Sequence, residues 1–356
     1  MNRTRLRGTG LKLEWLLEPG PLNAITDVPG VRVGHAHVEA ADPAAQTGVT
    51  AILPHAGNLF EEKCPAAVWA LNGAGECTGS LMINEWGVLD TPLFLTGTNS
   101  LGRVYDAALD WVFAKNPDLA AGRNWTWVIP CVSECDDGWL NDARRFRAGK
   151  AEVEGALAAA REGPVAEGCV GAGRGMVCFG LKGGVGTSSR RVPGTPWHVG
   201  VLALCNFGRR AELTLAGVRL GKALGDVPVP GHQQPAAPQG DGSVIGVIAT
   251  DAPLDHRELG RLCKRAGLGI GRTGTAARHG SGDIFIAFSR ASRGAEGGLD
   301  VNEAFHATAE AMEEAVYNAL FAGTTTTGRE GRTVHALPVE KTLEVLRSRR
   351  PDLFKP

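Results

Sequence analysis

The chain has 356 residues, with 37 lysines and arginines against 38 aspartates and glutamates, and a net charge of −1 at pH 7. This balance excludes the basic field that binds nucleic acid and the polybasic patch that binds membranes, and it favours a small neutral or zwitterionic substrate. No stretch approaches the length of a membrane span, and the basic N-terminus lacks the apolar region of a signal peptide. We therefore expect a soluble cytoplasmic protein.

Glycine and cysteine give two further constraints. The 49 glycines are about twice the usual share of roughly 7 %, which indicates many tight turns and close backbone approaches. The eight cysteines are scattered, several of them within apolar runs, and are typical of buried free thiols, not of a disulfide framework. Cys131 and Cys135 alone are only a weak signal for a metal site.

Five short apolar runs rich in valine and isoleucine predict strands, at residues 49–53, 125–132, 199–207, 244–250 and 284–288. Because these runs are apolar on both faces, helices or another sheet should cover the sheets they form. Helices are predicted over residues 100–114, 144–161, 255–268 and 303–321. Asp255 is placed as an N-cap and Gly323 as a stop. Together these elements predict a layered α/β sandwich.

The acidic residues Glu134 and Asp136 follow the predicted strand that contains Trp127. Carboxylates in a pocket would suit the ammonium group of a substrate. The alternative is an ordinary solvated loop.

Segment 171–189 is rich in glycine, and Lys182 lies within it with hydroxyl residues close behind. The spacing does not match a phosphate-binding loop or a dinucleotide fingerprint, so a glycine-rich bend beside an active site is the better interpretation. Asn206 ends the next apolar strand. Its amide could donate to a developing oxyanion, or it could simply cap a turn.

Residues 225–242 form a loop rich in proline, glycine and glutamine, and composition alone favours an interdomain linker. The loop ends in Gly242 and Ser243, and Ser243 opens an apolar strand. A surface loop that leads into a buried strand is also what a processing site needs. Cleavage before Ser243 would give one residue both a hydroxyl nucleophile and an α-amine with a pKa of about 8, which can act as its own base.

Segment 279–283 runs directly into the last predicted strand. If it is extended, His279, Ser281 and Asp283 lie on one face. If it is a turn, Ser281 and Asp283 merely satisfy backbone donors. The three neighbours make a poor Ser-His-Asp triad, because side chains on one face of a strand are about 7 Å apart and a triad normally draws on separate elements.

In this order, the segments resemble the DmpA-like family of self-processing L-aminopeptidase/D-Ala-esterase/amidases and β-aminopeptidases, peptidase family S58. The resemblance runs nearly end to end, through residues 25–35, 72–79, 140–142, 171–190, 241–243, 249–254, 279–289 and 334–338. It implies a four-layer αββα sandwich, like the N-terminal nucleophile hydrolases in architecture but different in connectivity. It also implies a single domain over residues 1–356, cleaved into an α-subunit 1–242 and a β-subunit 243–356.

The resemblance also implies roles for individual residues. The chain would cut itself between Gly242 and Ser243, after which Ser243 is the nucleophile and its own amine the base. Asn206 matches the oxyanion donor, and Ser281 and Asp283 match the hydroxyl and acidic pair beside the nucleophile. No metal or organic cofactor is required, and the assembly implied is a homo-oligomer of αβ heterodimers, a tetramer.

The substrate pocket departs from the family pattern. Trp127 and Glu134 match pocket residues, and Glu134 is suited to holding a substrate amine. Asp136 stands where well-known members carry tyrosine, which removes an aromatic wall or hydroxyl donor and adds negative charge. Asn99 stands where histidine is common.

The predicted function is therefore hydrolysis of N-terminal residues from short peptides, aminoacyl amides or esters. An acyltransferase of related fold, which would pass the same serine ester to an amine, is the enzymatic alternative. A non-catalytic, glycine-rich binding protein is the alternative from another class.

Overall fold

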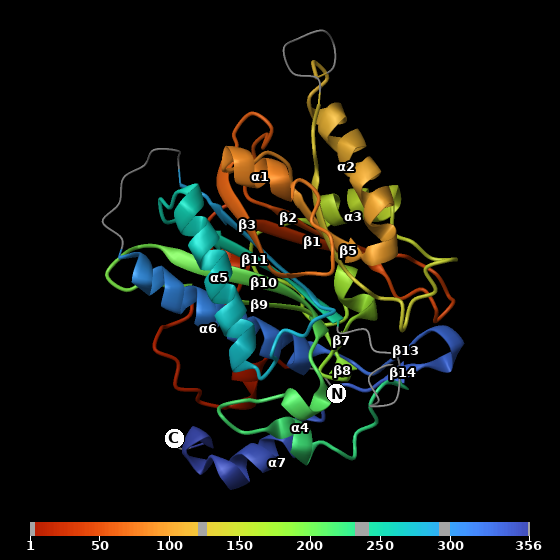
Figure 1. The fold of residues 1–356 in the computed structure, drawn as a ribbon, viewed down its shortest axis with the longest axis vertical. Helices are drawn as coiled ribbons and strands as arrows, with labels where there is room; N and C mark the ends of the chain where they lie inside the picture. The colour runs from red at the N-terminus through yellow and green to blue at the C-terminus, as the bar shows by residue number, and fades with distance from the viewer. Residues whose placement is uncertain (1–3, 120–126, 232–241, 292–299, 355–356) are drawn as a thin grey trace.

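Two stacked sheets with helices on their outer faces form the molecule in a computed structural model that describes residues 4–119, 127–231, 242–291 and 300–354. Figure 1 shows the layers in order: α2 and α3, the sheet containing β1, β2 and β5, the sheet containing β9 to β11, and then α5 and α6. This arrangement confirms the predicted αββα sandwich.

The larger sheet has six strands in the order β4-β3-β12-β11-β10-β9, and only the β11–β12 pair is parallel. Helix α5 (His256–Arg272) connects that parallel pair, and α5 and α6 (Val301–Ala322) cover the outer face. The strands are β3 (Cys64–Gly73), β4 (Val88–Leu89), β9 (Gly184–Arg191), β10 (His198–Phe207), β11 (Gly242–Thr250) and β12 (Gly282–Ser289).

The smaller sheet has four strands in the order β1-β2-β5-β6, covered by α2 (Leu101–Lys115) and α3 (Lys150–Ala159). Its strands are β1 (Arg32–His37), β2 (Gly48–Leu53), β5 (Leu93–Gly97) and β6 (Cys131–Cys135). The shorter elements are α1 (Ser80–Trp86), α4 (Leu220–Ala223), α7 (Val339–Arg349), β7 (Val177–Cys178), β8 (Leu181–Lys182), β13 (Thr326–Thr327) and β14 (Thr333–Val334).

Strand β10 shows why the central runs are apolar on both faces. Leu202 and Leu204 belong to the core between the two sheets, whereas Val201, Ala203 and Cys205 belong to the core beneath α5 and α6. Alternate side chains of a strand point to opposite faces, so a sheet covered on both sides needs apolar residues at every position.

Most predicted elements are confirmed within a few residues, and Asp255 caps α5 by accepting a hydrogen bond from the Glu258 N–H at 2.8 Å. The strand predicted at 125–132 is wrong over residues 127–130, because pairing with β5 begins only at Cys131. Residues 125–126 lie outside the described part. Helix α3 begins at Lys150, six residues later than predicted, where the Glu152 carboxylate accepts from the Gly149 N–H at 2.8 Å.

The cysteines are free, and seven of the eight are buried as predicted. Cys169 is the exception, because it lies partly exposed near Thr324. Most of the loop predicted at 225–242 cannot be compared with the structure, since residues 232–241 lie outside the described part. None of the helices seen in the described residues has both the length and the apolar character needed to cross a bilayer.

Helix α6 packs closely on strand β9, and one glycine makes this possible. A Cβ atom at Gly186 would lie 1.9 Å from the Ala315 carbonyl oxygen of α6. No real side chain fits there, so the contact depends on glycine. Gly260 in α5 differs, because a Cβ atom there would meet the Ala67 Cβ at an ordinary 3.7 Å.

We therefore expect opposite effects from two matched substitutions. Gly186→Ala should lower the free energy of unfolding by about 1–3 kcal/mol, because the helix must move off the sheet. Gly260→Ala should raise it by roughly 0.5–1 kcal/mol, since alanine is the better helix former. Denaturant unfolding of both variants measures the difference, and equal effects would contradict the packing argument.

Candidate active site

The Gly242–Ser243 junction opens strand β11 at the edge of a cavity of about 610 Å³. Gly242 has a φ of 82°, and a Cβ atom there would lie 2.1 Å from the Asn206 carbonyl oxygen, so the position requires glycine. Ser243 is buried, and its Oγ donates a hydrogen bond to the Gly242 carbonyl oxygen at 2.7 Å. The hydroxyl therefore lies next to the carbonyl that precedes it.

Asn206 lies directly opposite Ser243 in the antiparallel pair of β10 and β11. Its Oδ1 accepts from the Val177 N–H at 2.7 Å, and its Nδ2 donates to the Asp136 carbonyl at 2.9 Å. These two bonds fix the orientation of the amide. Because Nδ2 carries two hydrogens and one is used here, the group retains a donor for an oxygen in the cavity it lines.

Ser281 and Asp283 lie on the other side of β11, where Gly282 pairs with Ser243 in parallel register. Ser281 Oγ donates to Asp283 Oδ1 at 2.6 Å, and Asn72 Nδ2 donates to Asp283 Oδ2 at 3.0 Å. Burial raises the pKa of the Asp283 carboxyl above its usual value, against the opposing effect of these two bonds. The pair therefore flanks the backbone of Ser243.

The extended conformation, one of the two alternatives predicted for segment 279–283, is wrong for its first residues. His279 is exposed in a turn, and the strand begins only at Gly282. The turn interpretation is also incomplete, because the Ser281 hydroxyl bonds the Asp283 carboxylate and not a backbone group.

Glu134 lies on strand β6, is buried, and lines the same cavity. Its Oε1 accepts from the Glu76 N–H at 2.9 Å, and its Oε2 accepts from the Thr98 hydroxyl. Burial raises the pKa of Glu134, and the hydrogen bonds to Thr98 and Glu76 only partly offset this. The carboxylate is thus held rigidly at the cavity wall.

Asp136 also lines the cavity, and its Oδ1 accepts from the Gly138 N–H at 2.9 Å. Trp127 does not line the cavity, as far as the described residues show. It is 42 % exposed and packs against Trp86, with ring centroids 5.5 Å apart and the ring planes tilted by 54°. Trp139 is the tryptophan that lines this cavity.

Lys182 belongs to the interior of the protein and not to a phosphate site. Its ammonium is fully buried and donates to the carbonyls of Gly173, Met176 and Gly183, each at 3.0 Å. The glycine-rich segment thus wraps around a buried cation, and it reaches the cavity through Val177, the partner of Asn206.

Two residues that the sequence analysis did not single out support the site. Asn72 holds Asp283, and Thr98 holds Glu134. Asp137, in the acidic segment after strand β6, is not among the described residues that line the cavity; it is fully buried, and burial raises its pKa to about 7 despite the nearby Thr47 and Asn141 side chains. The only available signal was that these residues follow apolar runs.

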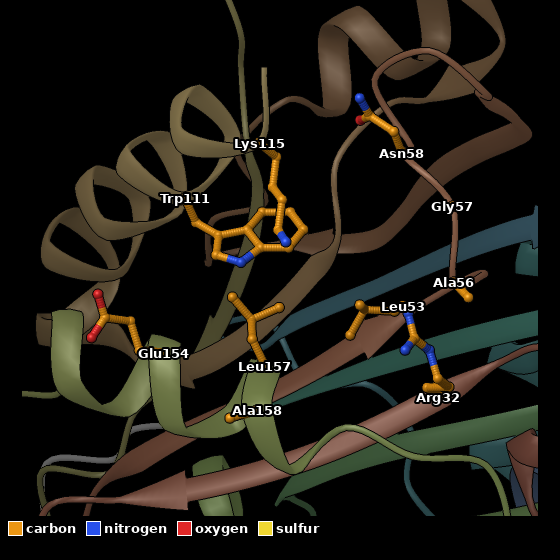
Figure 2. A pocket seen from close by; sticks show the side chains of 10 residues that line it. All are labelled: Arg32, Leu53, Ala56, Gly57, Asn58, Trp111, Lys115, Glu154, Leu157 and Ala158. Carbon is orange, nitrogen blue, oxygen red and sulfur yellow. The ribbon is translucent and has the colours of Figure 1, made fainter. Parts of the chain in front are cut away.

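A different cavity, of about 480 Å³, lies against helices α2 and α3. Figure 2 shows Trp111 and Lys115 on α2 facing Leu157 on α3 across it. Among the described residues, it shares no lining residue with the Ser243 cavity and offers no hydroxyl or thiol nucleophile. Of these two cavities, the one at Ser243 is therefore the candidate active site.

Known proteins resemble this chain along nearly its whole length. A model of "Peptidase family S58" matches residues 23–334. The β-peptidyl aminopeptidase BapA of Sphingosinicella microcystinivorans is 40 % identical over 97 % of this chain and 92 % of its own.

Two solved structures share the fold. A Burkholderia sp. β-aminopeptidase has a TM-score of 0.85 and 41 % identity, covering 97 % of this chain and 99 % of its own. The L-aminopeptidase D-Ala-esterase/amidase of Ochrobactrum anthropi has a TM-score of 0.86 and 36 % identity, covering 97 % and 98 %. The latter is described as a new variant of the Ntn hydrolase fold, which agrees with the predicted architecture.

The buried Asp137 carboxyl generates a prediction about stability. Because the pKa of Asp137 is about 7 in the folded state and about 3.9 in the unfolded state, its cost to stability is absent below about pH 4, grows as the pH rises to about 7, and is complete above that. Asp137→Asn removes the ionisation. We expect it to raise the melting temperature at pH 8 by several degrees, and by clearly less at pH 5.

Glu167, whose pKa burial also raises to about 7, titrates in both proteins and cancels in the difference. Calorimetry at the two pH values checks the prediction. An equal shift at both would show that Asp137 is not the titrating group.

Proposed function

Because the chain belongs to peptidase family S58, and is therefore a hydrolase of the aminopeptidase type, we propose that it is a self-processing serine aminopeptidase. One observation carries the proposal: the Ser243 hydroxyl, the Gly242 carbonyl, the Asn206 amide and the Glu134 carboxylate meet at a single cavity. These groups are a nucleophile, its first target, an oxyanion donor and an amine anchor.

In self-processing, Ser243 Oγ attacks the Gly242 carbonyl carbon. The Gly242–Ser243 C–N bond breaks, the nitrogen takes up the proton that the hydroxyl loses, and an ester joins the two residues. Water then hydrolyses this ester, which leaves a carboxylate on Gly242 and a free α-amine and hydroxyl on Ser243. The 2.7 Å hydrogen bond between Oγ and the Gly242 carbonyl oxygen supports this step, because it holds the reacting groups together.

In the mature enzyme, the same Oγ attacks the carbonyl carbon of a substrate amide or ester. The α-amine of Ser243 accepts the hydroxyl proton and passes it to the leaving group, and the acyl-enzyme is hydrolysed by water. The Asn206 amide donates to the oxyanion. Ser281 and Asp283 flank the position of the new amine and stabilise its ammonium form, which the parallel pairing of Ser243 with Gly282 supports.

Glu134 anchors the ammonium group of the substrate in this proposal. Its buried carboxylate is fixed by two hydrogen bonds and faces a cavity without a basic side chain among its described lining residues. A free N-terminal amine is therefore what the site selects, and hydrolysis of short peptides, aminoacyl amides or esters is the reaction we propose. The family assignment favours hydrolysis over acyl transfer.

We also propose a cytoplasmic homo-oligomer, a tetramer of αβ heterodimers. The seven buried free thiols support a reducing compartment. The exposed, touching side chains of Trp86 and Trp127 support association, because large apolar groups gathered at a surface are typical of contacts between subunits.

The central test is Ser243→Ala. Wild type should separate on denaturing electrophoresis into two fragments, the smaller of which begins Ser-Val-Ile-Gly on N-terminal sequencing. Ser243→Ala should stay a single chain without hydrolytic activity, because the attacking oxygen is gone. Ser289→Ala, at the far end of strand β12, is the matched control and should still be cleaved. An intact and fully active wild-type chain would refute the proposal.

A second test uses the acidity of Glu134. Because burial raises its pKa above the usual 4.5, the carboxylate should protonate, and KM should begin to rise, at a pH above that value as the solution is acidified. Glu134→Gln should raise KM about ten- to hundredfold at neutral pH, the value of a charge-assisted bond, and should abolish the acid dependence. The exposed Glu76 gives the matched control. Glu76→Gln should keep the acid dependence, moved slightly to lower pH, since the Glu76 backbone N–H contacts Glu134 and its side-chain charge makes only the smallest of the contributions that raise the pKa of Glu134.

A further inference from the structure

A further cavity, distinct from the one against α2 and α3, adjoins the Ser243 cavity. It measures about 490 Å³ and shares two lining residues, Asn99 and Gly138, with the Ser243 cavity. Its other lining residues are mainly polar or charged: Asn141, Asp142, Ala143, Arg144, Arg147 and Arg329. A substrate longer than one residue can therefore extend from one cavity into the other.

The charges of the two cavities are opposite. The Ser243 cavity carries the carboxylates of Glu134 and Asp136. The adjoining cavity carries three guanidinium groups and the single carboxylate of Asp142, and we call it the arginine cavity. A molecule with a cation at one end and an anion at the other matches both cavities together.

The three arginines differ in how firmly they are held. Arg329 is anchored, because it donates to the Glu330 carboxylate at 2.8 Å and to the Gly138 carbonyl at 3.5 Å. Gly138 lies where the two cavities meet, so one guanidinium is held at their border. Arg144 is held less firmly, because its guanidinium is 3.9 Å from the Asp142 carboxylate and its side chain is 86 % exposed.

Arg147 is the arginine with most capacity to bind an anion. It is exposed, and within the described residues it makes no hydrogen bond or ion pair. Guanidinium groups bind carboxylates through two parallel hydrogen bonds, an arrangement that a lysine cannot match.

We propose that the arginine cavity binds a carboxylate of the substrate, so that the preferred substrates carry both a free amine and a carboxylate. The inference rests on the proposed aminopeptidase function and names its substrate class. The carboxylate is either the C-terminus of a short peptide or the acidic side chain of an N-terminal residue. In both cases Glu134 holds the amine while Arg147 and its neighbours hold the opposite charge.

Two matched substrate pairs distinguish these sources. The first is alanyl-alanine against alanyl-alanine amide, which differ only in the C-terminal carboxylate. The second is glutamyl against glutaminyl p-nitroanilide, which differ only in the side-chain charge. We expect wild type to favour the carboxylate-bearing member of one pair by about tenfold in kcat/KM, which is the effect of a charge-assisted bond. High salt should reduce this preference, since Arg144 and Arg147 are exposed.

Arg147→Gln should reduce the ratio of kcat/KM between the carboxylate-bearing and the amide members to near one, and Arg147→Lys should retain part of it. Arg257→Gln on the exposed start of α5 makes the same change in net charge away from both cavities, and should leave the ratio as in wild type. The pair that loses its preference in Arg147→Gln identifies the source of the carboxylate.

Two failures can be told apart. If wild type hydrolyses the amide members but shows no preference in either pair, or a preference that Arg147→Gln leaves intact, the arginine cavity has no role in specificity and the inference is overturned alone. If wild type hydrolyses neither these four compounds nor the β-alanyl counterparts of the first pair, the aminopeptidase proposal fails and the inference fails with it.

Discussion

The pairing of β11 with β10 on one side and β12 on the other is the constraint on which the candidate site depends. It sets Ser243 opposite Asn206 and beside Gly282, so residues from three separate parts of the chain meet at the end of one sheet. A shift of one residue in either pair would turn Ser243 to the other face and into the core. The apolar faces of the three strands, buried on both sides, hold the register in place.

The same pairing explains which parts of the molecule can be predicted from the sequence. Apolar runs and an N-cap such as Asp255 are local signals, and the elements that depend on them are found close to their predicted positions. The junction at Ser243 is also a local signal, since a polar loop meets an apolar strand there. Asn72 and Thr98 are different. Their roles come from contacts with residues far away in the chain, Asp283 and Glu134, which no local pattern specifies.

Buried carboxyl groups give the site its electrostatic character. Glu134 lies in the wall of the Ser243 cavity and Asp283 lies on the strand beside Ser243, and burial raises the pKa of both. Each is held by at least two hydrogen bonds from neighbouring groups, which keeps its geometry fixed. Such groups reduce folding stability when ionised, and sites of chemistry are where proteins tolerate that cost. The arrangement is consistent with selection for a bound ammonium group, either of a substrate or of a chain terminus.

In the proposed mechanism, the position of Gly242 also affects how soon the cleaved enzyme can act on an external substrate. It pairs with Phe207 as the first residue of β11, and it lines the cavity in which a substrate must bind. In that mechanism, the Gly242 carbonyl of the uncleaved chain occupies the acyl position. Cutting the peptide bond would then not be sufficient for turnover, because the new C-terminus must also leave the end of the sheet. The rate at which that single residue unpairs would then set the delay between cleavage and the first turnover of an external substrate.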